Sequence, residues 1–163
     1  MIDLLRPEQA ESVSIGGVDV IFRISGRETN DAYAVLEFCL EPGRLIPPHA
    51  HRREHEVSYV LEGEIGVRIE DEEITAKQGC LVVKPPQVAH AWWNAAASPA
   101  RVLEVISPAG FEGYFAELAE IHASRGFRDP RMIADLQDRY GVTASADWIP
   151  LLKATHGLKL LGE

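Results

Sequence analysis

Three histidines and one glutamate stand at spacings that would let them share a metal ion. His49 and His51 are two residues apart, so both imidazoles leave the same face if this segment is a β-strand. Glu56 follows His51 by five residues, an odd step that would put it on the opposite face of one continuous strand. We therefore expect a turn at residues 52–54, after which Glu56 points back at the histidines. His90 arrives later, from another strand.

Such a set of side chains suits a catalytic ion better than a structural one. Three neutral imidazoles and one carboxylate leave a divalent ion with a net charge of about +1 and, in a six-coordinate geometry, with open positions for substrate. Imidazole suits iron, nickel, copper and zinc, and the carboxylate also allows manganese. Two other interpretations stay open: four polar groups that only satisfy one another inside a barrel, and a metal site without turnover.

Two segments hold these residues in a defined order. Residues 43–63 read G-x5-H-x-H-x4-E-x6-G, and residues 79–94 read G-x5-P-x-Q-x2-H-x3-N. Together they resemble the two sequence motifs of cupins, and the first is matched at every defining position. The second departs once, because Gln87 stands where the family usually has glycine. A side chain is disfavoured there if φ is positive.

The resemblance implies a fold, a ligand set and a chemistry. The implied fold is all-β dominated, a cupin double-stranded β-helix (jelly-roll) barrel, here with two C-terminal α-helices. The implied ligands of one divalent metal ion (Fe, Mn, Ni, Zn or Cu) are His49, His51, Glu56 and His90. Residues 107–111 and the helix after them also resemble quercetinase-like single-domain cupins. In those proteins the carboxylate corresponding to Glu56 acts as general base on an enolic substrate, which dioxygen then attacks.

Short apolar runs separated by glycine, proline and charged turns predict an antiparallel barrel or sandwich. The strand-like runs cover residues 18–24, 33–40, 57–61, 65–69, 80–83 and 102–106. Residues 62–64 and 70–72 are expected to form hairpin turns. We expect one domain, in which residues 1–106 form the barrel with N-terminal strands and residues 107–163 form a helical extension packed on it.

The pattern becomes helical after residue 107. One helix face is predicted to hold Phe111, Tyr114, Phe115, Leu118, Ala119 and His122. Gly126 is the expected stop of this helix, and Asp129 with Pro130 begins a second one. Residues 143–163 are rich in apolar side chains without clear periodicity. They pack against the outside of the barrel, form a lid over its mouth, or contribute to a subunit interface.

Strand parity also indicates which neighbours of the predicted ligands share their strand face. His55 is adjacent to a ligand in sequence and so points to the other strand face, which excludes it from the set. Trp92 shares the face of His90, where its indole could stack against an aromatic substrate, while Trp93 would face outward. Phe38 could line the same cavity. Plain core packing is the alternative for Phe38 and Trp92.

Composition narrows the class of partner. The 163 residues, 46% of them hydrophobic and 25% charged, suit one soluble globular domain. Sixteen basic and 25 acidic residues give a net charge of −9, which repels nucleic acid and anionic membranes. The N-terminus lacks a leader pattern and no long apolar stretch follows, so we expect a cytoplasmic protein. Cys39 and Cys80 are expected to be reduced, buried thiols on strands.

The predicted function is that of a metal-dependent cupin, a dioxygenase acting on a small aromatic or enolic substrate, with Glu56 as the catalytic base. One alternative is a metal-dependent isomerase or decarboxylase of a sugar or keto acid. A barrel interior rich in arginine and lysine would favour it, whereas the strands here are mostly apolar, with Arg68 and Lys84 as exceptions. Another is a small-ligand-binding cupin without catalysis. The expected partners are a small-molecule substrate and a second copy of the chain, as a homodimer.

Overall fold

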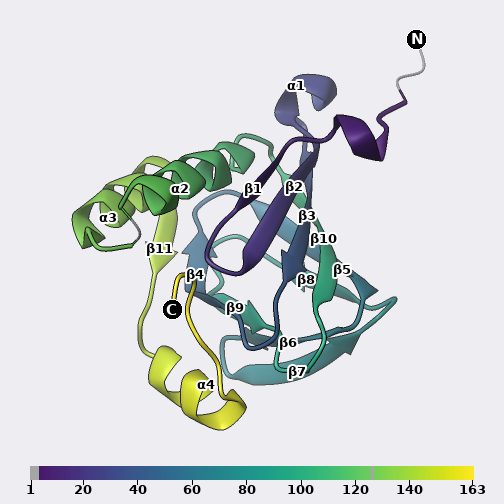
Figure 1. Ribbon diagram of the computed structural model, residues 1–163. Coiled ribbons are helices and arrows are strands. Elements are labelled where there is room, and N and C mark those ends of the chain that lie inside the picture. Colours follow the sequence, from purple (N-terminus) through teal and green to yellow (C-terminus); the bar gives the residue numbers. More distant parts are fainter. Residues whose placement is uncertain (1–3, 126) are drawn as a thin grey trace.

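Two antiparallel β-sheets face each other, and two of the helices lie along one side of them (Figure 1). The computed structural model describes residues 4–125 and 127–163. Residues 1–3 and Gly126, where we expected the first C-terminal helix to stop, lie outside the described residues.

The sheets have six and five strands. In spatial order the first contains β1 (Ser12–Ser14), β2 (Val18–Ile24), β3 (Ala34–Leu40), β10 (Ala100–Ser107), β5 (His55–Glu62) and β8 (Leu81–Lys84). The second contains β11 (Val142–Ala144), β4 (Leu45–His51), β9 (His90–Trp93), β6 (Glu64–Ile69) and β7 (Glu72–Lys77). The helices are η1 (Pro7–Gln9), α1 (Gly26–Thr29), α2 (Glu112–Arg125), α3 (Pro130–Arg139) and α4 (Ile149–His156).

The core lies between the two sheets because alternate residues of each strand point inward. On β10 the buried residues are Ala100, Val102, Glu104 and Ile106, every second position. Burying the apolar members of this pattern removes their surface from water and drives the sheets together. The six predicted strands are all present, as β2, β3, β5, β6, β8 and β10, with ends shifted by at most two residues.

Two predicted turns have different outcomes. Ile69 pairs with Glu72, so Glu70 and Asp71 form the tight loop of the β6–β7 hairpin, as expected. The turn around Gly63 was wrongly predicted to close a hairpin. It carries the chain from β5 in one sheet to β6 in the other. Both segments have residues typical of a hairpin turn, and only the packing of the two sheets decides which strand the next strand pairs with.

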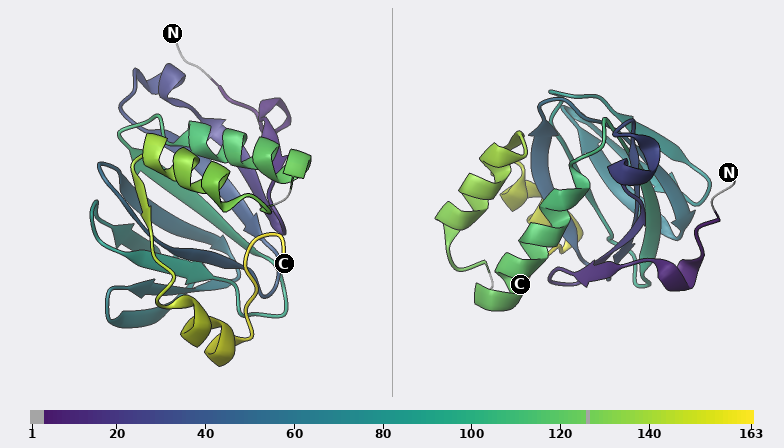
Figure 2. Two further views of the ribbon diagram at one scale, coloured as in Figure 1. Left: turned by 90° about the vertical axis from the view of Figure 1, so that its left-hand side faces the viewer. Right: turned by 90° about the horizontal axis from the view of Figure 1, so that it is seen from above.

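Helices α2 and α3 match the two that the sequence predicts, and they cover one side of the barrel (Figure 2). Phe111, Leu118 and Ala119 on the predicted apolar face are buried. Asp129 caps α3, because its carboxylate accepts a hydrogen bond from the Arg131 backbone N–H. β11 then pairs with β4 and extends the five-stranded sheet.

The C-terminal segment packs on the outer face of the five-stranded sheet. Leu152 on α4 and Leu158 beyond it are buried against Trp93 and Leu45. Trp93 does point away from the barrel interior, but this packing leaves it only 2% exposed. Its indole lies across Gly66, where an added Cβ would come within 2.1 Å of the ring. The sequence predicted two C-terminal helices, and α4 is a third, formed where the apolar residues show no clear periodicity but pack on Trp93.

The outer face of the six-stranded sheet carries a separate ion-pair cluster. Glu37 on β3 is 3% exposed and is bound by Arg23 and Arg101, with N–O distances of 2.7 and 2.6 Å. Both cysteines are free thiols, but only the half-buried Cys39 lies on a strand. Cys80 is exposed in the turn before β8, which corrects the prediction of a buried strand position. Across the described residues, none of the helices is long and apolar enough to cross a membrane.

Candidate metal centre

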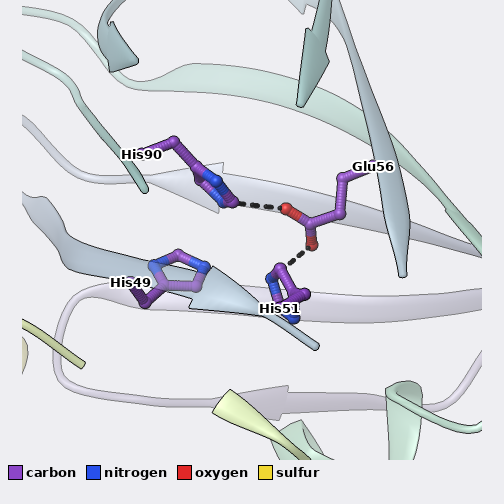
Figure 3. A group of neighbouring side chains, drawn as sticks. All are labelled: His49, His51, Glu56 and His90. Atoms are coloured by element: carbon purple, nitrogen blue, oxygen red, sulfur yellow. Dashed lines mark ion pairs between the residues drawn. The ribbon is translucent and has the colours of Figure 1, made fainter. Parts of the chain in front are cut away.

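Four side chains from three strands converge between the sheets (Figure 3). His49 and His51 lie on β4, His90 on β9 and Glu56 on β5. One potential ligand atom from each residue lies within 4.8 Å of those of the other three. His49 is directly opposite His90 in the β4–β9 ladder. Glu56 reaches them from the facing sheet, because the turn after β4 changes sheets as the spacing required.

Backbone carbonyls set the protonated nitrogen in two of the rings. His49 Nδ1 is 2.8 Å from the Pro47 carbonyl oxygen, and His90 Nδ1 is 3.1 Å from that of Val88. A carbonyl oxygen only accepts, so in each neutral ring Nδ1 carries the proton and Nε2 keeps its lone pair. A hydrogen bond from Nδ1–H to a backbone carbonyl commonly orients an imidazole that binds a metal through Nε2.

The buried Glu56 carboxylate faces two imidazole rings at the centre of the site. His90 Nε2 is 3.2 Å from Glu56 Oε2, and His51 Nε2 is 3.4 Å from Glu56 Oε1. Neither contact has hydrogen-bond geometry, and within the described part of the chain these ring nitrogens have no other partner. Since the carboxylate and the His90 Nε2 lone pair both accept, a cation between them satisfies both. Three imidazoles and a carboxylate therefore fit a divalent metal.

For His49, His90 and Glu56, electrostatics favours the protonation states that metal binding requires. Burial, and then the charges of the other two rings, hold the pKa of His49 well below its usual range. Burial also lowers the pKa of His90. Burial opposes ionisation of Glu56, but the charge of Lys84 and the contacts with two histidines outweigh it, so the pKa of Glu56 lies well below its usual range. Neutral imidazoles and an ionised carboxylate are ready to bind a metal.

A cavity of about 90 Å³ borders the site and has mostly aromatic and aliphatic walls. Phe38 and Trp92, the two predicted pocket residues, both line it, with their rings edge to face and 5.5 Å apart. Helix α2 and the residue before it close the cavity with Phe111, Tyr114, Phe115 and Leu118. The polar part of the wall comes from His49, Glu56, Glu104 and Gln137.

Phe111 belongs to the walls of both this cavity and a surface cleft. The cleft has a volume of about 400 Å³ and is also lined by Arg52, Arg53 and Arg139. The Phe111 ring packs edge-on against the ring of His51, with centroids 4.4 Å apart. One aromatic side chain therefore borders the buried site on one side and the arginine-lined surface on the other.

Neighbouring residues follow the parity of the strands, with one correction. His55 is exposed on the outer face of β5, away from the four converging residues. Glu54 lies in the predicted turn, where a charged side chain is usually solvated, but it is only 2% exposed. Its carboxylate folds back and accepts hydrogen bonds from the Arg53 backbone and guanidinium, at 3.1–3.3 Å, which satisfies it without water.

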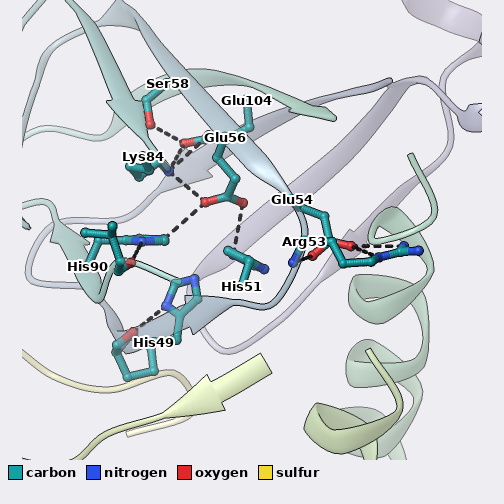
Figure 4. A network of polar contacts seen from close by, with 11 residues as sticks. His49, His51, Arg53, Glu54, Glu56, Ser58, Lys84, His90 and Glu104 are labelled. Carbon is teal, nitrogen blue, oxygen red and sulfur yellow. Dashed lines mark hydrogen bonds and ion pairs between the residues drawn. The ribbon is translucent and has the colours of Figure 1, made fainter. Parts of the chain in front are cut away.

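A buried polar group beside Glu56 was not predicted as part of the site (Figure 4). Lys84 Nζ lies 3.1 Å from Glu56 Oε2 and 3.0 Å from Glu104 Oε1, and the Ser58 hydroxyl donates to the same oxygen of Glu104. The sequence showed Lys84 only as a charged exception on an apolar strand. Parity with Val102 and Ile106 could have shown that Glu104 points inward. Arg68, the other exception, instead faces outward over the Trp148 ring.

Comparison with known proteins bears on the family and the fold. Residues 36–106 match the family model described as Cupin domain. The fold is a cupin jelly roll. The domain match and the fold support placement in the cupin superfamily, whereas the quercetinase-like subtype stays a prediction. Among curated proteins, none matches the sequence significantly.

Solved cupin-fold structures align with about two thirds of the chain. KdgF from Halomonas sp. aligns over 68% of this chain and 99% of its own, with 17% identity and a TM-score of 0.61. An RmlC-like cupin from Shewanella frigidimarina NCIMB 400 aligns over 66% and 92%, with 25% identity and a TM-score of 0.57. The polyketide cyclase RemF from Streptomyces resistomycificus aligns over 66% and 80%, with 23% identity and a TM-score of 0.56.

Gln87, the departure from the second cupin motif, has the backbone conformation that favours glycine. Its φ is 64°, and its N–H donates to the His51 carbonyl oxygen at 2.7 Å. The turn therefore ties the second motif to the histidine strand of the first. A residue with a Cβ is strained in this left-handed conformation by about 1–2 kcal/mol.

We predict that Gln87→Gly stabilises the protein by about 1 kcal/mol, because it relieves this strain, and raises the unfolding temperature by about 2–4 °C. Thermal unfolding followed by circular dichroism measures the change. Gln87→Ala keeps the Cβ and serves as the matched control, expected to unfold near the wild-type temperature. Equal shifts in both variants would show that the side chain, not the backbone, causes the effect.

A second prediction concerns the convergence of the four residues. His90→Ala should lower metal affinity by more than the roughly 10- to 100-fold that loss of an outer-shell partner costs, because it removes one of four donors. Elemental analysis of freshly purified protein gives the retained metal per chain. His55→Ala changes an adjacent, outward-facing histidine and should retain as much metal as the wild type. A metal content in His90→Ala equal to that of His55→Ala would contradict the assignment.

Proposed function

We propose that this cupin is a metal-dependent dioxygenase that acts on a small aromatic or enolic compound with an acidic hydroxyl group. The observation that carries the proposal is the cavity, which is lined both by potential metal ligands and by aromatic rings. His49 and Glu56 line it together with Phe38 and Trp92. A ring held between these aromatic side chains would present its hydroxyl group to the metal site.

Cavity size supports a compact substrate. Pockets for drug-sized ligands measure about 300–1,000 Å³, well above the roughly 90 Å³ enclosed here. A single-ring catechol or a small enol suits the closed site better than a three-ring flavonol, which would require α2 to move away. This narrows the quercetinase-like expectation to smaller members of the same chemical class.

The chain's own residues define the roles of the site. His49, His51 and His90 offer nitrogen lone pairs, and a bound divalent ion would supply Lewis-acid activation of a hydroxyl group and of dioxygen. Glu56 faces the cavity as an ionised carboxylate and accepts the hydroxyl proton. Because the pKa of Glu56 lies well below its usual range, this carboxylate is a weak base, and it would take the proton of a hydroxyl group that a bound divalent ion makes more acidic. The apolar walls exclude water from the deprotonated substrate.

The alternative of a sugar or keto acid isomerase or decarboxylase has less support from the cavity. A substrate rich in hydroxyl or carboxylate groups needs matching donors, but among the described residues no arginine or lysine lines the cavity. Lys84 is buried behind it and already bound to Glu56 and Glu104. Neighbours in fold include a polyketide cyclase and a nucleoside dehydratase, which support an enzymatic role but, at 23% and 17% identity, not a reaction.

We predict oxygen uptake when iron-, manganese- or nickel-loaded protein meets catechols or small enols, with flavonols slower. An oxygen electrode measures the rate, and mass spectrometry with labelled dioxygen detects incorporation of both atoms. Glu56→Gln should reduce turnover by about 10²–10⁴-fold, because it removes the proton acceptor. Metal content is measured in parallel so that loss of metal is recognised.

His55→Ala is the matched control for this experiment and should keep full activity. No uptake above that of metal-free protein, with every metal and every substrate class, would refute the dioxygenase proposal. Product formation without oxygen would favour the isomerase or decarboxylase alternative, and a co-purified ligand without turnover would favour a binding protein.

We also propose that the protein forms a homodimer through an apolar patch on the outer face of the six-stranded sheet. The patch consists of Val57, Tyr59, Leu81, Val83, Leu103 and Val105. These residues are neighbours across β10, β5 and β8, because Val105, Val57 and Val83 form one row and Leu103, Tyr59 and Leu81 another. Leu81 is 65% and Val83 59% exposed. A contiguous exposed patch of this kind supports an interface.

We predict that Val83→Glu converts a dimer into a monomer, because a carboxylate in the patch would be desolvated in the interface. Light scattering coupled to size exclusion measures the mass. Leu151→Glu is the matched control, since Leu151 is 56% exposed on α4, outside the patch. A dimer that survives Val83→Glu but not Leu151→Glu would move the interface to the C-terminal segment.

A further inference from the structure

Lys84 has no role in the function proposed above, although it is the most enclosed cation near the site. Its side chain is 1% exposed. Its three N–H donors meet three carboxylate oxygens, because Nζ lies 3.1 Å from Glu56 Oε2 and 3.0 and 3.1 Å from the two oxygens of Glu104 (Figure 4). The Ser58 hydroxyl donates to Glu104 Oε1 at 2.5 Å.

This polar group occupies two neighbouring inward-facing rows of the six-stranded sheet, because Lys84 is opposite Glu56 and Glu104 is opposite Ser58. The next inward residue on each of the three strands is a buried valine: Val82 on β8, Val60 on β5 and Val102 on β10. The three strands are neighbours in one antiparallel sheet, with β5 between the other two. The group is therefore held by strand pairing as well as by its own contacts.

Stability alone does not account for such a group. Desolvating an ammonium and a carboxylate is costly, and well-packed apolar residues in their positions are often as stable or more so. Valines on the same strands show that this interior accepts apolar side chains. What an apolar pair could not do is form an ion pair with Glu56.

The contact with Lys84 divides the two oxygens of Glu56. Oε2 is paired with the Lys84 ammonium, while Oε1 lies on the side of His51, 3.4 Å from its Nε2. Lys84 in turn cannot swing away without leaving the two Glu104 oxygens that hold it. Lys84 thus fixes the orientation of the Glu56 carboxylate toward the histidines.

We propose that Lys84 is a positioning residue: clamped by Glu104 and Ser58, it holds the Glu56 carboxylate in the orientation that completes the metal site before the metal arrives. The inference rests on the metal site of the proposed function. It does not depend on which substrate is used or on whether the reaction consumes oxygen.

The charges of the group allow positioning to be separated from simple electrostatics. Lys84 and Glu104 cancel each other, so the double variant Lys84→Met/Glu104→Gln removes the clamp and leaves the net charge of the site unchanged. Methionine fills a volume close to that of the lysine stem, and glutamine keeps an acceptor for the Ser58 hydroxyl.

The test is a titration of metal-free protein with Co²⁺ alone, followed by visible absorption and competition with a chelator. The wild type is expected to bind one equivalent. The double variant should bind about 10- to 100-fold more weakly, as expected for loss of an outer-shell partner, with altered visible bands because the ligand geometry changes. A purely structural role would lower thermal stability without moving the bands of the bound ion.

A matched control exists on the outer face of the same sheet. Arg101→Met/Glu37→Gln removes a comparable buried carboxylate and one of its two cations, also without change in net charge, but away from the four converging residues. Its Co²⁺ affinity and bands should equal those of the wild type.

Each outcome decides between the proposals. A folded Lys84→Met/Glu104→Gln variant with wild-type affinity and bands overturns the positioning role and leaves the dioxygenase proposal intact. A wild type that binds no Co²⁺ overturns both. If the double variant does not fold, Ser58→Ala loosens the clamp without changing any charge. It should weaken Co²⁺ binding by a smaller factor, and wild-type affinity in that variant would also overturn the positioning role.

Discussion

An ionised carboxylate and imidazole lone pairs buried in one interior repel one another unless a cation joins them, and the rest of the structure depends on this constraint. The carboxylate comes from one sheet and the three imidazoles from the other. The two sheets must therefore pack face to face before the site exists. The same packing that drives folding, burial of the alternating apolar residues, also brings the donors together.

Much of this arrangement follows from residue parity. The odd step from His51 to Glu56 required a turn, and the structure has one that changes sheets. The two-residue alternation of β2, β3, β5 and β10 and the apolar face of α2 were predictable for the same reason. Each of these features depends on a local periodicity that can be read from the sequence.

Other features depend on partners that are distant in sequence. The turn at Gly63 has the composition of a hairpin turn, and only sheet packing shows that β5 and β6 part there. α4 lacks a clear apolar period and is held by Trp93. Lys84 and Glu104 lie 20 residues apart on strands that do not adjoin, so no local pattern links them. The sequence therefore did not predict that Lys84 and Glu104 support the site, although it predicted the four converging residues.

The aromatic residues around the cavity serve two purposes at once. Phe38 contacts Trp92 and Phe115 edge to face, with centroids 5.5 and 5.1 Å apart, as core side chains do. The same rings form the walls of the space beside Glu56. The sequence could not decide whether Phe38 and Trp92 pack in the core or line the pocket. In the structure these side chains do both.

The pairing of β11 with β4 gives the helical cover a mechanical link to the histidines. Val142 is opposite His51 and Ala144 opposite His49, only a few residues after the end of α3. Gln137 on α3 and Val142 and Ala144 on β11 also line the cavity. Any movement of this segment that widens the cavity must pull on the backbone ladder of the strand that carries two of the histidines. Access to the site and the geometry of its nitrogen donors are therefore coupled through main-chain hydrogen bonds rather than through side chains.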